Sequence, residues 1–287
     1  MSTLYSIKTS KKSFEISLPG SATVKDLKLA FAKEAKKDIN RISFKVGLIR
    51  LDDDSKSLTK DYNLTAASEI TFKDLGPQIG YRTVFLVEYF GPMLFVGLYA
   101  LRPDFLYGKD ASATPYNIVA LTGVICWMAH FLKRELETLF VHKFSRPTMP
   151  LSNLFKNCAY YWIFGAVIGY PLCAPSFAAP SETQFYAGLA IFVLCELGNL
   201  ICHVMLSNLR PAEGSKKRPI PKGFLFDYVA CPNYTFEVMS WVGFSIMTGL
   251  LFSYAFTIVV SYCYCYYLIY FIYILHLYYM IILIMKL

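Results

Sequence analysis

Charged residues are scarce in this chain of 287 residues, and the scarcity is greatest toward its C-terminal end. Only 17% of the residues are Asp, Glu, Lys or Arg, against roughly 25% in a typical soluble domain. About half of them precede residue 80, and the stretch between Glu237 and Lys286 contains none. A long uncharged stretch rich in Leu, Ile, Val, Phe and Tyr suits hydrocarbon better than a globular core. The sequence therefore predicts a membrane protein with a polar N-terminal part.

Several common chemical signatures are also missing. The eight cysteines form no C-x-x-C pair, and Cys263 and Cys265 have no His or carboxylate beside them, so no metal site is predicted. The absence of G-x-G-x-x-G argues against a Rossmann-type grip on a nicotinamide cofactor, and no P-loop, G-x-S-x-G or H-E-x-x-H occurs. The modest net charge of +8 is interpreted as loop charge of a membrane protein, not as a sign of nucleic-acid binding.

Residues 1–76 are predicted to form a small cytosolic α/β domain. Residues 4–7 and 14–18 alternate as strands do, and Val24, Leu27 and Phe31 then recur at helical spacing. Residues 43–46 and 70–75 are two further expected strands. A hairpin, a helix and then more strands is an order that resembles a ubiquitin-like β-grasp domain. A short Gly- and Pro-containing linker follows this domain.

The rest of the chain is predicted to be a mostly α-helical, multi-span membrane domain with about six transmembrane helices. Its apolar runs approach the roughly 20 residues that a spanning helix needs, at 83–101, 116–132, 158–175 and 185–206, with room for two or three more within 224–285. We expect this membrane domain to cover residues 77–260. Residues 261–287 form an atypical Tyr-, Ile- and Leu-rich tail that is long enough for an additional span.

The loops between these runs indicate an orientation. The loops at 133–156 and 207–223 each carry five Lys or Arg residues, whereas the alternate loops at 102–114 and about 171–183 are neutral or slightly acidic. Basic loops stay preferentially on the cytosolic side. The pattern therefore predicts that both basic loops, and the N-terminal head, are cytosolic.

Ionisable residues within the predicted spans are the first candidates for a functional site, because charge in hydrocarbon is costly. Glu88 lies in the first run, where it is either functional or a solvated or paired interfacial carboxylate. His130 ends the second run, and the spacing of Arg134 and Glu137 places them on a shared helix face, which also suits a plain interfacial ion-pair network.

Two further groups of polar residues occur near the ends of later runs. Glu196, Asn199 and His203 form a stripe along one helix face, which is more typical of a cavity lining than of a lone hydrogen-bonded histidine. Tyr234 and Glu237 lie three residues apart after Pro232, so they share a face of the helix that Pro232 begins. Tyr234 could donate a proton to an enolate, although a membrane-interface tyrosine is the simpler interpretation of the pattern alone.

Long sequence blocks resemble the trans-2-enoyl-CoA reductases of very-long-chain fatty acid elongation, in the steroid 5α-reductase superfamily. These blocks include VEYFGP at 87–92, LETLFVHKFS at 136–145, FKNCAYYW at 155–162, LGNLICH at 197–203 and CPNYTFE at 231–237. The ubiquitin-like head followed by a membrane part is the arrangement of that family as well. The resemblance extends from the head to about residue 250.

The resemblance implies a reaction and its site. NADPH would deliver a hydride to C3 of a trans-2-enoyl-CoA, and protonation at C2 would give the saturated acyl-CoA. It implies Tyr234 as proton donor and Glu88 as the second essential group. The cofactor contacts it implies are Asn199, His203, Arg210, Asn233 and Glu237. A multi-pass protein of the endoplasmic reticulum membrane is expected, which works on acyl-CoA in the bilayer beside other elongation enzymes.

The sequence departs from the family pattern in two places. Phe131 and Phe236 stand where relatives often have Tyr, and the uncharged run after about Tyr254 replaces a polar tail that contributes to cofactor binding in the superfamily. Two alternatives therefore stay open. The chain could reduce another conjugated enone, such as a steroid or polyprenal, or it could be an inactive variant that binds elongation partners.

Overall fold

The computed structural model describes residues 2–144, 146–210, 219–262 and 265. The chain divides into two compact units. One is the head, up to Gly80 together with Thr148–Asn153, and the other is helical and contains Tyr81–Pro147 and the described residues from Leu154 onward. The expected tail at 261–287 lies almost entirely outside the described residues.

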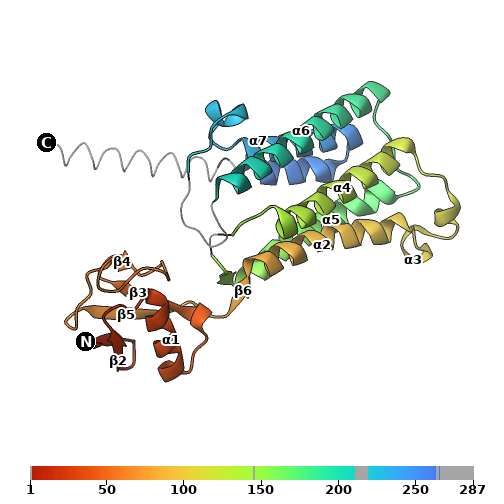
Figure 1. Cartoon of the computed structure of the whole chain (residues 1–287). Helices are drawn as coiled ribbons and strands as arrows, with labels where there is room; N and C mark the ends of the chain where they lie inside the picture. Colours follow the sequence, from red (N-terminus) through yellow and green to blue (C-terminus); the bar gives the residue numbers. More distant parts are fainter. Residues whose placement is uncertain (1, 145, 211–218, 263–264, 266–287) are drawn as a thin grey trace. The chain divides into compact units, whose positions relative to one another are not determined.

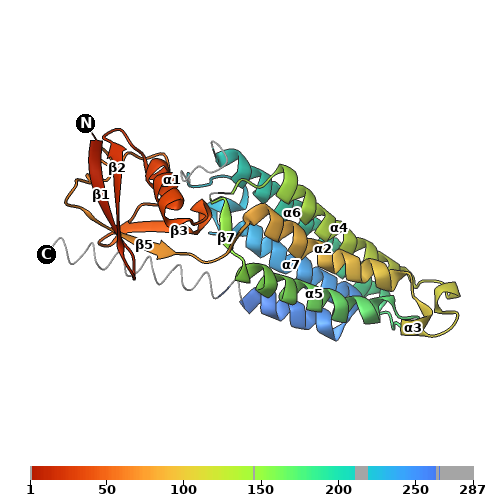
Figure 2. The same ribbon diagram turned by 90° about the horizontal axis from the view of Figure 1, so that it is seen from below.

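The head contains a five-stranded sheet with the strand order β2-β1-β5-β3-β4. Its strands are β1 (Ser2–Lys8), β2 (Ser13–Pro19), β3 (Ile42–Val46), β4 (Ile49–Arg50) and β5 (Glu69–Asp74). Figure 1 labels β2 to β5 together with helix α1 (Val24–Ala35), and Figure 2 labels β1. Neighbouring strands of this sheet are antiparallel, except that β1 and β5 are parallel. This order, with one helix after the first hairpin, is the β-grasp topology that the sequence predicts.

A compact apolar core holds the head together. Phe31 of α1 packs edge-on against Phe44 of β3, with ring centroids 5.3 Å apart, and both side chains are fully buried. The helix begins with a capping box, since Thr23 accepts a hydrogen bond from the Asp26 amide and Asp26 accepts one from the Thr23 amide. All buried residues of this core lie between Tyr5 and Ile70, so the head has a core of its own.

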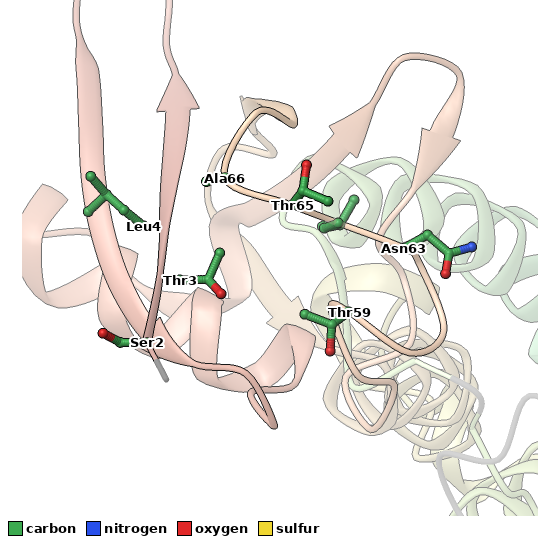
Figure 3. A pocket seen from close by; sticks show the side chains of 8 residues that line it. Ser2, Thr3, Leu4, Thr59, Asn63, Thr65 and Ala66 are labelled. Carbon is green, nitrogen blue, oxygen red and sulfur yellow. The ribbon is translucent and has the colours of Figure 1, made fainter.

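The surface of the head has a shallow hollow of about 620 Å³. Figure 3 shows that its lining comes from the start of β1 and from the loop before β5, through Ser2, Thr3, Leu4, Thr59, Asn63, Leu64, Thr65 and Ala66. These residues are uncharged, so the hollow offers neither an acid–base pair nor a cation for an anionic ligand. A second small sheet in this unit pairs β6 (Gln78–Gly80) with β7 (Thr148–Pro150).

Among its described residues, the helical unit has five long helices, which run side by side in both views (Figures 1 and 2). They are α2 (Tyr81–Ala100), α4 (Ile118–Phe140), α5 (Ser152–Cys173), α6 (Glu182–Leu209) and α7 (Pro232–Thr248), with the short helix α3 (Asp104–Tyr107) between the first two. Three-residue and four-residue 3-10 turns lie at Ile39–Arg41, Ala111–Ala113 and Phe224–Asp227. A further apolar helical segment covers Leu251–Tyr262.

Aromatic side chains and glycines set the packing of this bundle. Trp127 of α4 and Trp241 of α7 are buried, with ring centroids 5.3 Å apart. Helices α6 and α7 approach so closely that a Cβ on Gly188 would lie 2.3 Å from the Met247 amide nitrogen. Small residues at such crossings let two membrane helices pack backbone against backbone. This contact fixes the relative positions of the α6 and α7 side chains described below.

Within the described residues, two helices are long and apolar enough to cross a membrane by length and composition, namely α2 and α6. The expected run at 116–132 is α4, which continues to Phe140 and so includes four charged residues in its last two turns. Helix α7 has 17 residues, which is short of the roughly 20 that a full span needs. The expected runs are therefore helices, but only part of them carry the apolarity of a simple span.

Candidate active site

Polar side chains from four helices meet at one end of the bundle. Helix α4 contributes His130, Lys133, Arg134 and Glu137, which recur at spacings of three and four and so lie on neighbouring faces of its C-terminal half. The facing groups come from the C-terminal half of α6, the first turns of α7 and the first half of α2. The loop expected to begin at residue 133 begins after α4 instead, so Lys133 and Arg134 are helical and largely buried.

Lys133 connects α4 with α6. Its Nζ lies 2.8 Å from Glu196 Oε2 and donates a hydrogen bond of 2.6 Å to Asn199 Oδ1. Asn199 is buried, and its amide nitrogen donates to the backbone carbonyl of Asn233 at 2.9 Å. One cation thus orders the α6 stripe, and Asn199 extends that order to the first turn of α7.

His130 joins the same network from the preceding turn of α4. Its Nδ1 lies 2.8 Å from Glu196 Oε1, and its Nε2 lies 3.5 Å from Glu237 Oε1. The ring also packs on Trp241, with centroids 4.5 Å apart. Each nitrogen of the buried imidazole therefore faces a carboxylate, one from α6 and one from α7.

Arg134 is the centre of a second network. Its NH1 donates to Glu137 Oε2 at 2.8 Å, and its NH2 donates to the Tyr89 hydroxyl at 2.9 Å. His203 Nδ1 lies 2.9 Å from the same Glu137 oxygen and 3.1 Å from Arg134 NH1. The guanidinium also lies 5.0 Å from the centre of the Tyr89 ring, a cation–π distance. Two positively charged groups, Arg134 and Lys133, thus lie one residue apart and hold different partners.

Two histidines and a carboxylate lie close together at the edge of this network. One ligand-type atom from each of Glu137, His142 and His203 lies within 4.8 Å of the others. Burial, followed by the nearby Arg134, lowers the pKa of His142 to about 3, so its ring is neutral at neutral pH. Arg134 already neutralises Glu137 and would repel a dication beside it. An ion-pair network accounts for these residues better than a metal site.

Glu88 of α2 is almost completely buried, with an exposed fraction of 1%. Its Oε2 accepts a hydrogen bond of 2.7 Å from the side-chain amide of Asn157 on α5. The sequence left open whether Glu88 is solvated or paired with a basic neighbour near the interface. The structure instead gives it an amide partner and a dry environment, in which one hydrogen bond fixes the orientation of the carboxyl group.

Tyr234 and Arg210 lie outside the most buried part of these networks. Tyr234 is in the first turn of α7, directly after Asn233, and its side chain is 56% exposed. Arg210 caps α6, where its guanidinium donates to the carbonyl of Lys143 while Lys143 Nζ donates to the carbonyl of Arg210. The structure thus links Asn199 directly to Asn233, and it connects Glu237 to the same network through His130 and Glu196. Arg210 is held against the chain segment after α4.

The arrangement suits an anionic ligand that carries hydrogen-bond donors. Lys133 and Arg134 are paired with Glu196 and Glu137, and Arg210 at the end of α6 adds a positive charge of the kind that the phosphates of a dinucleotide require. Glu137 Oε1 is buried and has no hydrogen-bond partner among the described residues. A buried orphan acceptor is costly, and an amide or hydroxyl of a ligand would satisfy it. These residues therefore fit a nicotinamide dinucleotide.

Three residues of these networks were not singled out as site candidates from the sequence alone. Hydropathy places Lys133 in a loop, and Tyr89 and Asn157 occur only as parts of the VEYFGP and FKNCAYYW blocks. Their partners are 66, 45 and 69 residues away in sequence, so no local spacing could have indicated the contacts. Tyr89 and Asn157 lie within two of the sequence blocks that resemble the family, and this resemblance is the signal that points to them.

Comparison with known proteins identifies the family. Residues 147–280 match the family model described as 3-oxo-5-alpha-steroid 4-dehydrogenase, a match that reaches well into the Tyr- and Ile-rich run. The chain is 45% identical over 254 residues to a putative enoyl-CoA reductase of Trypanosoma brucei brucei, with 84% of each chain covered. It is 39% identical to the very-long-chain enoyl-CoA reductase of Dictyostelium discoideum, covering 88% of this chain and 85% of that one. A probable very-long-chain enoyl-CoA reductase of Caenorhabditis elegans is 40% identical, with coverages of 84% and 81%.

These comparisons identify an oxidoreductase of the steroid 5α-reductase family, whose reductases use a nicotinamide cofactor. Within it, the chain belongs to the enoyl-CoA reductases. Two solved ubiquitin-like domains are similar to part of this chain. A ubiquitin-like domain from Arabidopsis thaliana is 26% identical and covers 25% of this chain and 77% of its own, with a TM-score of 0.24. That of mouse tubulin-specific chaperone e is 22% identical, with coverages of 28% and 92% and the same TM-score. The β-grasp assignment accordingly depends on strand order.

Proposed function

We propose that this chain reduces a very-long-chain trans-2-enoyl-CoA to the saturated acyl-CoA with NADPH, the last reaction of an elongation cycle. The observation that carries the proposal is the 45% identity to an enoyl-CoA reductase over 84% of both chains. The buried networks of α4, α6 and α7 support it, because they place cations and an unsatisfied acceptor in one region.

NADPH supplies the hydride that reaches C3 of the substrate. Asn199, His203 and Glu237, with Asn233 and Arg210 at the neighbouring helix ends, are the residues proposed to hold it. Lys133 donates a hydrogen bond to Asn199 and Arg134 contacts His203, while Asn199 in turn donates to the Asn233 carbonyl, so these groups are held in fixed orientations. A preorganised polar site avoids rearrangement during the reaction, which is the main requirement for stabilising developing charge.

Tyr234 is proposed to donate the proton that reaches C2 of the enolate. Its hydroxyl group lies on a half-exposed ring, so a substrate can reach it, unlike the fully buried Tyr89. It also lies in the first turn of α7, where the positive end of the helix dipole favours the negative charge that remains on the oxygen after proton transfer. Glu88, oriented by Asn157, is the second group proposed to hold a proton or a hydrogen bond during turnover.

The proposal extends to the placement of the chain. The family and the apolar helices indicate a membrane protein. We infer about six spans and a domain division at 1–76, 77–260 and 261–287. We also infer an endoplasmic reticulum location with the head in the cytosol. The basic segments after α4 and α6 support this orientation. Other elongation enzymes are the expected partners, since the substrate is the product of the preceding step in the same cycle.

The experiment compares the purified protein with Tyr234→Phe and, as a matched control, Tyr228→Phe, which alters an exposed tyrosine six residues earlier. NADPH oxidation with a long-chain trans-2-enoyl-CoA should fall about 10²- to 10⁴-fold in Tyr234→Phe, with NADPH binding retained, and stay unchanged in the control. Equal turnover in both variants would remove Tyr234 from the reaction. Activity on a steroid enone but not on enoyl-CoA would favour the alternative substrate, and loss of NADPH binding in the unmodified protein would favour an inactive variant.

A further inference from the structure

The tip of the β3–β4 hairpin presents apolar side chains to the exterior of the head. Val46 pairs with Ile49, so the turn consists of Gly47 and Leu48 alone. Gly47 has a φ of 57°, the positive value that tight two-residue hairpins need at their first turn position. Leu48 is completely exposed and Ile49 is 60% exposed. This two-residue hairpin therefore carries two consecutive exposed aliphatic residues, Leu48 in the turn and Ile49 at the start of β4.

Two cations flank this apex and face one another across the hairpin. Lys45 pairs directly with Arg50 in the register of β3 and β4, and both are exposed. Like charges at directly opposed strand positions destabilise a sheet. In the part of the chain that the structure describes, neither cation forms a salt bridge, whereas Lys37 and Arg41 of the same domain share Asp74. The hairpin thus combines an apolar apex with two exposed positive charges.

We propose that this tip, formed by Lys45, Leu48, Ile49 and Arg50, docks the head onto an anionic lipid surface. Aliphatic side chains that project beyond a pair of cations match the boundary of a bilayer, where acyl chains lie beneath negatively charged headgroups. The charges are complementary, and the apex inserts without disturbing the sheet behind it. The inference concerns the head alone and is independent of the reaction proposed above.

The size of the tip distinguishes a lipid surface from a protein partner. A stable protein–protein interface buries on the order of 1,200 Å² or more, which two aliphatic side chains and two cations cannot supply. A tethered membrane contact needs far less. Asp74 ends β5 and Tyr81 begins α2, so a segment that reaches at most about 25 Å links the head to a helix apolar enough to span a membrane. Such a tether gives a weak contact a high effective concentration.

Hydrogen exchange on the full-length protein tests the proposal directly. The protein is reconstituted in nanodiscs of phosphatidylcholine with or without phosphatidylserine, and exchange is followed in peptides covering residues 42–51. We expect slower exchange there in the anionic nanodiscs, and no such slowing in Leu48→Ser/Ile49→Ser. The matched control is Leu29→Ser, which alters an exposed leucine on α1 and should keep the slowing. Equal exchange in both nanodiscs, or equal loss of slowing in the control, would overturn the proposal.

A second measurement uses the head by itself, which is justified because its core comes entirely from residues 5–70. Residues 1–76 contain no tryptophan, so Leu48→Trp introduces a single fluorophore at the tip. Its emission should shift to the blue with anionic vesicles and be quenched by brominated lipids, unlike that of Leu29→Trp. Adding Lys45→Gln/Arg50→Gln should weaken vesicle binding about 30-fold, since each cation near an anionic surface contributes about 1 kcal/mol. An unshifted Leu48→Trp emission would exclude lipid contact and leave a protein partner as the occupant.

Discussion

Replacing Gly188 with alanine should force α6 and α7 apart. The new Cβ would lie 2.3 Å from the Met247 amide nitrogen and 2.6 Å from the Gly243 carbonyl oxygen, whereas ordinary contacts begin at 3.4 Å. Both obstacles are backbone atoms, which cannot move aside as a flexible side chain can. The helices would therefore have to separate by about 1 Å, because protein interiors are close-packed.

This separation of the helices has two consequences. Overpacking of this kind destabilises by about 1–3 kcal/mol, which exceeds the roughly 0.5–1 kcal/mol that alanine gains over glycine in a helix. The same displacement would stretch the 2.9 Å hydrogen bond between Asn199 and the Asn233 carbonyl, because these residues belong to the same two helices. A misplacement of about 1 Å in a catalytic site can lower turnover about 10²-fold.

The assay is denaturant or thermal unfolding in detergent, followed by tryptophan fluorescence, together with NADPH-dependent turnover. Gly97→Ala is the matched control, since a Cβ on this α2 glycine meets no atom within 4 Å. We expect lower stability and turnover for Gly188→Ala and unchanged or slightly higher stability for Gly97→Ala. If the two variants unfold at the same midpoint and turn over equally, the close approach of α6 and α7 is not what the structure indicates.

Two further predictions follow from contacts that are equally specific. Asn157→Leu removes the hydrogen bond to Glu88. Because a hydrogen bond to a carboxylate contributes about 1.5–3 kcal/mol, kcat/KM should fall about 10- to 100-fold and its pH profile should shift. An unchanged pH profile would show that Asn157 does not orient Glu88. In the head, hydrogen bonds from Arg41 and Lys37 hold the pKa of Asp74 well below its usual range. The ionised carboxylate therefore stabilises the domain at pH values above the unfolded pKa of about 3.9, and this stabilisation is lost as the pH falls. Urea unfolding of residues 1–76 between about pH 7 and pH 2 should show a smaller pH dependence in Asp74→Asn than in the unmodified head, and an identical slope would refute the role of these ion pairs.

Much of the head could be predicted from the sequence because its elements follow local periodicity. Residues 4–7 and 14–18 alternate, and they lie in β1 and β2, while the helical spacing of Val24, Leu27 and Phe31 corresponds to the buried face of α1. These patterns are short-range, and the elements that they predict pack into one core. The β-grasp order then follows, since few arrangements bury a single helix against such strands.

The helix boundaries near the candidate site were harder to predict. Hydropathy alone ends the second run at residue 132, but α4 continues to Phe140. Charged residues normally mark the end of a membrane span. Here the charged residues continue the helix inside the bundle, because Lys133 pairs with Glu196 and Asn199 of α6, and Arg134 pairs with Glu137. A hydropathy window contains no information about those partners, so it underestimates the length of the helix.

The sequence by itself determined that the chain has a polar α/β head and an apolar helical part, and its long blocks of residues indicated the enoyl-CoA reductases. It also placed Glu196, Asn199 and His203 on one helix face, because the helical repeat is fixed by the backbone. Only the tertiary structure decided which groups that face meets, such as Lys133 from α4 and Asn233 from α7. The physical reason is that periodicity specifies the direction of a side chain within its own helix, whereas its partner depends on how all the helices pack together.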